Sequence, residues 1–160
     1  MCQRLATFAV LFFALPMSVG EARAQMPEAE QVRETVTRFF DAMRAGDGDG
    51  LASLFHPDAT MKSVSVVDGQ ARVNHAEVAR FTSQVGAPRT QLWDERISNL
   101  EVRVDGPFAT AWMDYSFYAD ETFSHCGVNT FELLRSEEGW LVLGITDTRR
   151  TTDCPDESAR

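Results

Sequence analysis

The last hairpin of the chain decides the fold, and its residues 131–145 read FELLRSEEGWLVLGI. Alternating apolar segments flank Glu137-Glu138-Gly139, which fits a three-residue turn with the glycine in the left-handed conformation. Pairing the two strands about this turn sets Phe131 opposite Ile145. The register collects five apolar side chains on one face, as a buried face requires: Phe131, Leu133, Leu141, Leu143 and Ile145. The sequence therefore predicts two long antiparallel strands with one apolar face.

The rest of the chain divides into helices first and strands last. Alternation from residue 91 onward, broken by turns, predicts four antiparallel strands over 92–104, 108–119, 122–135 and 140–149. Helical spacing of apolar residues over 28–45 predicts an amphipathic helix that ends at Gly46. We expect Asp49 to cap a short helix through Phe55, residues 60–67 to form a strand, and Asn74 to cap another helix that ends at Gly86. This order predicts an α+β domain whose helices pack on one face of a curved antiparallel sheet.

Three short stretches resemble a known superfamily. They are LFHPDA at 54–59, FELL at 131–134 and GWLV at 139–142. With the order of elements, they resemble the nuclear transport factor 2-like superfamily over residues 28–150, and most closely exported members of its SnoaL-like and "putative lumazine-binding" group. The resemblance implies a cone that encloses a pocket, often with dimerisation through the outer face of the sheet. Isomerases, dehydratases and cyclases share this fold, so the fold alone does not determine the chemistry.

The first 24 residues have the layout of a secretory signal peptide. Arg4 precedes an apolar run over 5–19, and Ala22-Arg23-Ala24 provides small residues for cleavage after Ala24. A membrane anchor is the alternative, but the run is interrupted by Pro16 and is shorter than the roughly 20 residues that span a bilayer. We expect a periplasmic or secreted domain over 25–150 with an acidic tail over 151–160, and no membrane attachment after cleavage.

The charge and the motifs of the chain exclude several classes of binding partner. The net charge of −9 at pH 7 disfavours nucleic acid and anionic lipid, which repel an acidic surface. The sequence has no nucleotide-binding loop and no set of metal ligands, so we expect no cofactor and no metal. We expect the partner to be a small apolar or aromatic molecule.

Two cysteines, Cys126 and Cys154, lie beyond the expected signal peptide. In an oxidising compartment such a pair predicts a disulfide. The register of the last hairpin favours it, because Cys126 then lies opposite Arg150 and Cys154 follows only four residues later. Two free thiols, or half of a metal site, are the alternatives.

A polar cluster is expected where the apolar face of the last hairpin ends. The register sets Asn129 opposite Asp147 and Gly127 opposite Arg149, with His125 on the same face. A two-residue turn at Asp120-Glu121 adds four side chains of the preceding strand to this face: Trp112, Asp114, Ser116 and Tyr118. A slip of one residue would replace them by Met113 and Tyr115.

This cluster has the groups for acid-base chemistry. We expect His125 to exchange a proton, Asp147 or Asp114 to orient it, and Tyr118 to donate to developing negative charge. Ligand contacts are expected from Asn129, Arg149, His56, Trp112 and Phe39. The alternatives are a solvated rim, an ordinary Asp147–Arg149 salt bridge, and a His56 that caps a turn or faces solvent.

Three functions follow from these patterns. The first is an exported binder of a small apolar molecule, and the second is a cofactor-free isomerase, dehydratase or cyclase that uses a histidine–carboxylate pair. The third is a structural or interaction domain. Phe39 and Phe40 stand where the isomerase pattern would have a pocket tyrosine, which weakens that version of the enzyme hypothesis. The other face of the last hairpin, with Trp140 and Val142, is too apolar to leave exposed, so we also expect a homodimer.

Overall fold

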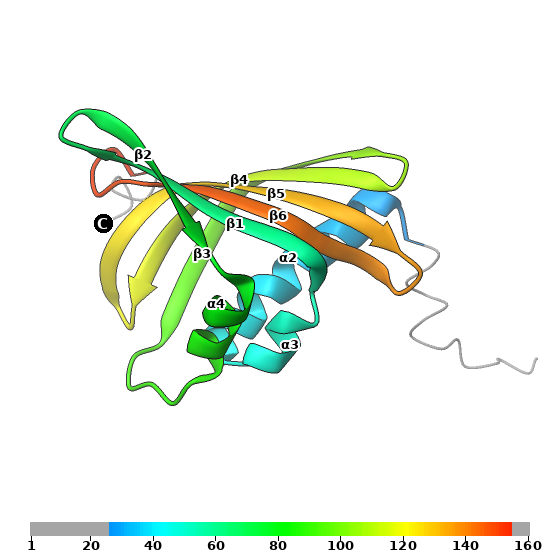
Figure 1. Ribbon diagram of the computed structural model, residues 1–160, viewed down its shortest axis with the longest axis horizontal. Helices are drawn as coiled ribbons and strands as arrows, with labels where there is room; N and C mark the ends of the chain where they lie inside the picture. Colours follow the sequence, from blue (N-terminus) through cyan, green and yellow to red (C-terminus); the bar gives the residue numbers. More distant parts are fainter. Residues whose placement is uncertain (1–25, 155–160) are drawn as a thin grey trace, which may run out of the picture.

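The computed structural model describes residues 26–154, so the expected signal peptide and most of the acidic tail lie outside the described residues. The helices are α2 (Glu28–Ala45), α3 (Gly48–Ala52) and α4 (Val78–Gly86). The strands are β1 (Phe55–Val67), β2 (Gln70–Ala76), β3 (Trp93–Asp105), β4 (Phe108–Ala119), β5 (Thr122–Ser136) and β6 (Gly139–Arg149). The predicted α+β class with a curved sheet is confirmed (Figure 1).

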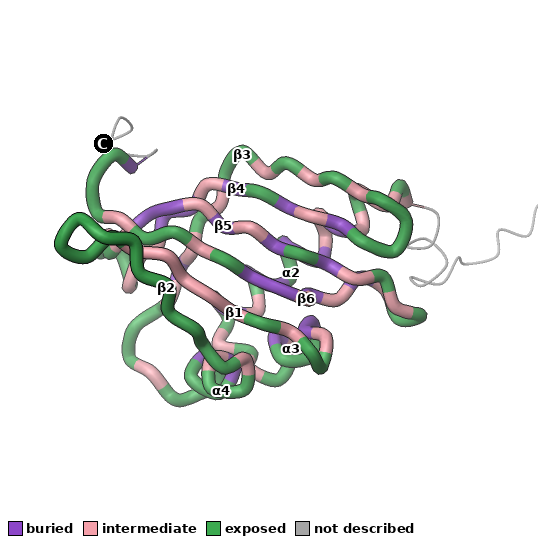
Figure 2. Tube along the Cα trace, turned by 45° about the horizontal axis from the view of Figure 1, so that its top comes forward, coloured by how far each residue is buried: buried purple, intermediate pink, exposed green. Residues whose placement is uncertain are grey.

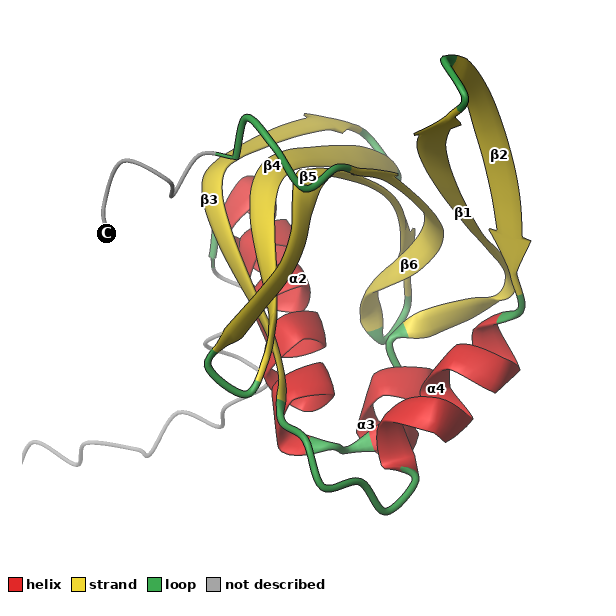
Figure 3. Ribbon diagram, turned by 90° about the vertical axis from the view of Figure 1, so that its left-hand side faces the viewer, coloured by secondary structure: helices red, strands yellow, loops and turns green. Residues whose placement is uncertain are grey.

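All six strands form one sheet in the order β2-β1-β6-β5-β4-β3. Neighbouring strands are antiparallel except β1 and β6, which pair in parallel. The sheet curls around α2, while α3 and α4 lie at one end of it (Figure 3). The β1–β2 hairpin extends away from the rest of the sheet, and every residue of β2 is exposed (Figure 2). The concave side of the sheet is therefore the side that the helices cover.

Helix α2 has the predicted bounds and provides one wall of the core. It starts directly after Pro27 and ends at Gly46, whose φ of 73° is the left-handed conformation that glycine adopts readily. Its buried face consists of Val32, Thr35, Val36, Phe39, Phe40 and Met43. These side chains pack with apolar residues of the strands, including the fully buried Leu133 and Val142. The apolar stripe thus places α2 against the concave face of the sheet.

Three details of the helical half differ from the prediction. Helix α3 ends at Ala52, and Phe55 begins β1 instead of ending the helix. Asp47, and not Asp49, caps α3 by accepting a 2.8 Å hydrogen bond from the backbone N–H of Gly50. Asn74 caps no helix, because it lies within β2, and α4 begins only at Val78. The Asp68-Gly69 turn, where both residues have positive φ, folds the chain straight back into this strand. The sheet consequently gains a strand that the sequence analysis did not expect.

The register of the last hairpin is confirmed away from its turn and wrong near it. Asn129 pairs with Asp147 and Phe131 with Ile145, as predicted. The turn itself has only two residues, because Ser136 pairs with Gly139. A bulge in β6 absorbs the extra residue, Leu143, because Glu132 pairs with Gly144 while Leu133 pairs with Val142. Trp140 and Val142 therefore join the core, with exposed fractions of 4% and 0%, and not the outer face.

A bulge also shifts the hairpin of β4 and β5. Ala119 pairs with Thr122 across the expected two-residue turn, but the register changes between Phe117 and Tyr118, so that Phe117 pairs with His125. The register predicted for β4 and β5 is therefore wrong beyond the first two pairs. From Phe117 onward the strands pair with the one-residue slip that was the alternative. Tyr115 and Met113 replace Tyr118 and Asp114 on the concave face.

The disulfide between Cys126 and Cys154 is present, with the two Cα atoms 5.8 Å apart. Cys126 also exchanges two backbone hydrogen bonds of 2.9 Å with Arg150, as the register predicted. The bond attaches residues 151–154 to β5 and is typical of proteins that fold in an oxidising compartment. Within residues 26–154, no helix is long and apolar enough to cross a membrane.

Candidate functional site

An open cavity of about 530 Å³ lies on the concave side of the sheet. Its apolar part is formed by aromatic rings around Phe39 of α2. The ring of Phe39 meets Phe131 of β5 edge to face, with 5.0 Å between centroids, and stacks on Phe81 of α4 at 6.2 Å. Met43, Met61, Trp93 and Ile145 complete this part. A flat apolar molecule would therefore find aromatic contact on several sides.

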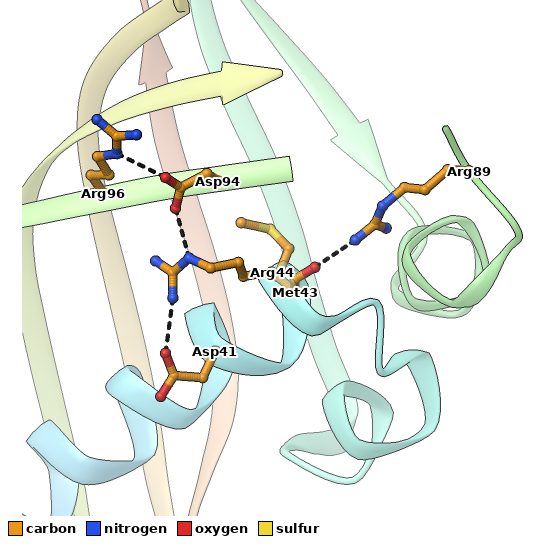
Figure 4. Close-up of polar contacts among 6 residues, drawn as sticks. All are labelled: Asp41, Met43, Arg44, Arg89, Asp94 and Arg96. Carbon is orange, nitrogen blue, oxygen red and sulfur yellow. Dashed lines mark hydrogen bonds and ion pairs between the residues drawn. The ribbon is translucent and has the colours of Figure 1, made fainter. Parts of the chain in front are cut away.

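The apolar end of the cavity is held by a polar network at the end of α2 (Figure 4). Arg44 and Arg96 each donate through Nε to the carboxylate of Asp94 at 2.7 Å, and Arg44 also pairs with Asp41. Burial alone would raise the pKa of the Asp94 carboxyl, but the hydrogen bonds from Arg44 and Arg96 outweigh burial and lower it. This network fixes the last turn of α2 against β3.

Arg89 fixes the opposite wall. Its guanidinium donates to the carbonyl oxygens of Val85 at 2.6 Å and Met43 at 2.8 Å, as Figure 4 shows for Met43. The same guanidinium lies 4.9 Å from the ring centroid of Trp93, close enough for a cation–π contact. One arginine thus joins α4, the end of α2 and a ring that lines the cavity.

The polar end of the cavity is built around Glu95 of β3. Asn129 of β5 donates from Nδ2 to Glu95 Oε1 over 2.6 Å. Burial raises the pKa of the Glu95 carboxyl to about 7, and the negative charge of Asp147 adds to this effect, while Asn129 and Arg149 oppose it. Glu95 is therefore a carboxyl group that exchanges its proton near neutral pH.

Tyr115 and the Asp147–Arg149 pair lie beside this carboxyl. Tyr115 is almost fully buried and donates from its hydroxyl to the carbonyl oxygen of Thr148 at 2.8 Å. Burial raises the pKa of this phenol, and the charges of Asp147 and Glu95 raise it further, so Tyr115 stays neutral. Arg149 donates from Nε to the carboxylate of Asp147 at 2.7 Å, and the opposite charges of the two side chains cancel.

His125 stands at the rim of the polar end. Its ring stacks on Phe117 with centroids 5.1 Å apart, and its Nδ1 lies 3.0 Å from the hydroxyl of Ser124. Burial lowers the pKa of the imidazole, and Arg149 lowers it further, while Asp147 partly opposes them. His125 is thus neutral at pH 7, when an imidazole can both accept and donate a hydrogen bond.

The structure brings together part of the predicted cluster. Five of the predicted site residues line the cavity: Phe39, His125, Asn129, Asp147 and Arg149. The other four do not line it. Because of the bulge, Trp112, Asp114 and Tyr118 lie on the convex face, where Asp114 accepts a hydrogen bond from Asn99 and Tyr118 meets the guanidinium of Arg96. His56 accepts a 3.1 Å hydrogen bond from the backbone N–H of Asp58, which is the turn-capping alternative.

Glu95 was not among the residues predicted for the site, and Tyr118 was predicted in place of Tyr115. A signal for Glu95 was present, because Trp93, Glu95 and Ile97 alternate along β3 and share one face. A carboxylate between two large apolar residues on the buried side of a strand is unusual unless it is paired or functional. No comparable signal marks Tyr115, since its position depends on the bulge.

Several comparisons place the chain among known proteins. Among solved structures, an NTF2-like protein with a cystatin-like fold from Novosphingobium aromaticivorans has a TM-score of 0.63 at 16% identity, over 89% of this chain and 96% of that one. A "putative dehydratase" of the NTF2-like family from Streptomyces avermitilis has a TM-score of 0.60 at 20% identity, over 77% and 96%. A protein of unknown function from Mycobacterium tuberculosis has a TM-score of 0.60 at 16% identity, over 76% and 75%.

These likenesses show the fold, which is that of the NTF2-like superfamily. No curated protein matches the sequence. Within residues 26–154, no three His, Cys, Asp or Glu side chains are grouped so that they could hold a metal ion. The family model described as "Putative lumazine-binding" matches residues 27–145, and the chain therefore belongs to this family of the NTF2-like superfamily.

Proposed function

We propose that the protein is exported and binds a small, largely apolar or aromatic molecule in the cavity. The observation that carries the proposal is the composition of the cavity, in which aromatic rings around Phe39 face a polar end built from Glu95, Asn129 and His125. Such a combination holds the body of a ligand by apolar contact and orients it by a few hydrogen bonds. The description of the family supports a small-molecule ligand, and the disulfide supports an oxidising compartment.

A thermal-shift screen of the purified protein against apolar and aromatic molecules tests this proposal. A ligand at about 100 times its Kd adds about 2.7 kcal/mol to the unfolding free energy, so Tm should rise by several degrees. The stabilisation should weaken in His125→Ala and persist in Val73→Ala, whose side chain is exposed on β2 and does not line the cavity. If no ligand raised Tm, the result would contradict the proposal and favour a structural or interaction domain.

Acid-base catalysis is a second candidate function, and the position of Glu95 favours it. A carboxyl with a pKa of about 7 and a neutral histidine that line the same cavity are suitable groups for proton transfer near neutral pH. The similarity to a structure described as a "putative dehydratase" supports this chemistry at the level of the fold. Loss of turnover in both His125→Ala and Glu95→Gln, with ligand binding retained, would distinguish an enzyme from a binder.

We also propose that the protein forms a homodimer through the convex face of the sheet. The support differs from what the sequence suggested, because Trp140 and Val142 belong to the core. Phe108 and Trp112 are instead 39% and 53% exposed on this face, next to Leu134. Light scattering should give the mass of two chains, and Trp112→Glu should halve it. A wild-type protein with the mass of one chain would refute the dimer.

Export is testable by intact mass. Cleavage after Ala24 should remove the first 24 residues when the full chain is produced in a host with a secretory pathway. A mass that retains these residues would contradict the signal peptide.

A further inference from the structure

The polar end of the cavity holds little uncompensated charge. Asp147 and Arg149 neutralise each other, and Tyr115 and His125 are neutral at pH 7. Glu95 is the exception, because no Lys, Arg or His nitrogen of the described residues lies within 4.0 Å of its carboxyl. A carboxylate without a cation in a partly dry site is costly, so the neutral acid is favoured.

The hydrogen bonds of Glu95 leave one of its oxygens available. Oε1 accepts from Asn129, while Oε2 has no hydrogen-bond partner among residues 26–154. A neutral carboxyl has one O–H donor, and the oxygen that accepts from Asn129 is the poorer place for that proton. When Glu95 is protonated, its O–H therefore belongs on Oε2, at the polar end of an aromatic cavity.

We propose that the Glu95 carboxyl, held by Asn129, is the hydrogen-bond donor that recognises an uncharged carbonyl group on an otherwise apolar ligand. This inference rests on the proposed binding function and specifies its ligand class. The ionised form of Glu95 would lack the donor and repel the lone pairs of the carbonyl, so binding should weaken as pH rises through the pKa of this group.

Other charged groups argue against an ionic ligand. An anion would meet a Glu95 carboxyl that ionises near neutral pH and the net charge of −9 on the whole chain. A cation would require ionised Glu95 and would meet Arg149 nearby. The groups that face Glu95 are Tyr115 on β4, His125 on β5, and Asp147 and Arg149 on β6, and the wider cavity adds His75, Glu77 and Arg80. Because the pKa of His125 is lowered by burial, this imidazole gains its proton on the acid side of the same pH range, so the test needs a variant of Glu95 itself.

Four naphthalene probes of similar size test the inference by fluorescence titration. They are 2-acetylnaphthalene, its hydrocarbon analogue 2-isopropylnaphthalene, the anion 2-naphthoate and the cation 2-naphthylmethylammonium. In the wild type, affinity for the ketone should fall about tenfold between about pH 5.5 and about pH 8.5, which is the loss of one hydrogen bond, while affinity for the hydrocarbon stays constant. Glu95→Gln keeps an N–H donor at every pH, so its ketone affinity should not change with pH.

The outcomes separate this inference from the proposed function. If the hydrocarbon and the ketone bind with the same pH dependence, or if either ionic probe binds more tightly than the ketone, the recognition by Glu95 is refuted while the apolar cavity stands. If none of the four probes binds, the proposed function fails and the inference fails with it. A pH dependence for the ketone that persists in Glu95→Gln would assign the effect to His125 and also refute the inference. If Glu95→Gln does not fold, His125→Ala decides instead: the pH dependence for the ketone should persist in this variant, and its loss would refute the inference.

Discussion

At the scale of single residues, Glu95 should give the protein an unusual pH dependence of stability. Its pKa rises from 4.5 to about 7 on folding, so between these values the folded chain holds a proton that the unfolded chain has lost. The unfolding free energy should therefore fall as pH rises from about 4.5 to about 7, by up to about 3 kcal/mol, and level off above. Urea unfolding at a series of pH values measures this slope.

The matched comparison for this prediction is Glu95→Gln, which keeps the size of the side chain and removes the ionisation. The difference in unfolding free energy between the two proteins should change over this pH window and be constant above it. Parallel pH profiles would show that the carboxyl is ionised in the folded state and would contradict the assignment.

The same residue shows what the sequence could and could not predict about the site. His125, Asn129, Asp147 and Arg149 were placed correctly because the predicted register holds from Phe131 and Ile145 outward, although the bulge changes it nearer the turn. The bond from Asn129 to Glu95 could not be predicted, since it joins two strands that are not neighbours in the sheet. Such contacts depend on the curvature of the sheet, which no local pattern specifies.

At the scale of elements, Gly127 allows β4, β5 and β6 to approach each other. A Cβ atom at this position would lie 1.8 Å from the carbonyl oxygen of Thr148 and 2.9 Å from the ring of Tyr115. Because both are held in the sheet, Gly127→Ala should lower the unfolding free energy by about 3 kcal/mol and disturb the polar end of the cavity. Chemical denaturation measures the loss.

Gly144 provides the control for this prediction. A Cβ atom at Gly144 would meet the carboxylate of Glu132 at 2.9 Å, and this group is the far end of a flexible side chain that can move away. Gly144→Ala should therefore cost less than about 1 kcal/mol. Equal losses in the two variants would mean that the close approach at Gly127 is not what requires a glycine.

Elements with a strong local pattern were predicted well, and those that depend on distant contacts were not. Helix α2 was predicted with its observed bounds because its apolar stripe and terminal glycine are local. Strand β2 was missed although Asp68-Gly69 is a typical hairpin turn, because the strand is short, polar and exposed on all residues. The bulges in β5 and β6 leave no turn residue or break in composition that would reveal them.

At the scale of the whole molecule, the disulfide should contribute much of the stability. It joins residues 28 positions apart and so restricts the unfolded chain. Replacing both Cys126 and Cys154 by Ala should lower the unfolding free energy by about 3 to 4 kcal/mol, and a reducing agent should have a similar effect on the wild type. Urea unfolding measures both losses.

The double variant also provides its own control, because a reducing agent should no longer change its stability. If the wild type is equally stable with and without reductant, the bond does not form in the purified protein. Because the residues attached by the disulfide follow Arg149, cavity binding should be measured in the same variant to learn whether the tail supports the site.

The bulge opposite Phe117 has a consequence for comparing this chain with its relatives. One inserted residue, Ser124, decides which side chains of β4, from Phe117 back to Phe108, point into the cavity and which point toward solvent. A homologue without this insertion could keep the same fold and nearly the same letters while exchanging the two faces. An alignment without a gap would then assign the role of Tyr115 to a side chain that never meets the ligand, so functional divergence in this family can arise from a single codon.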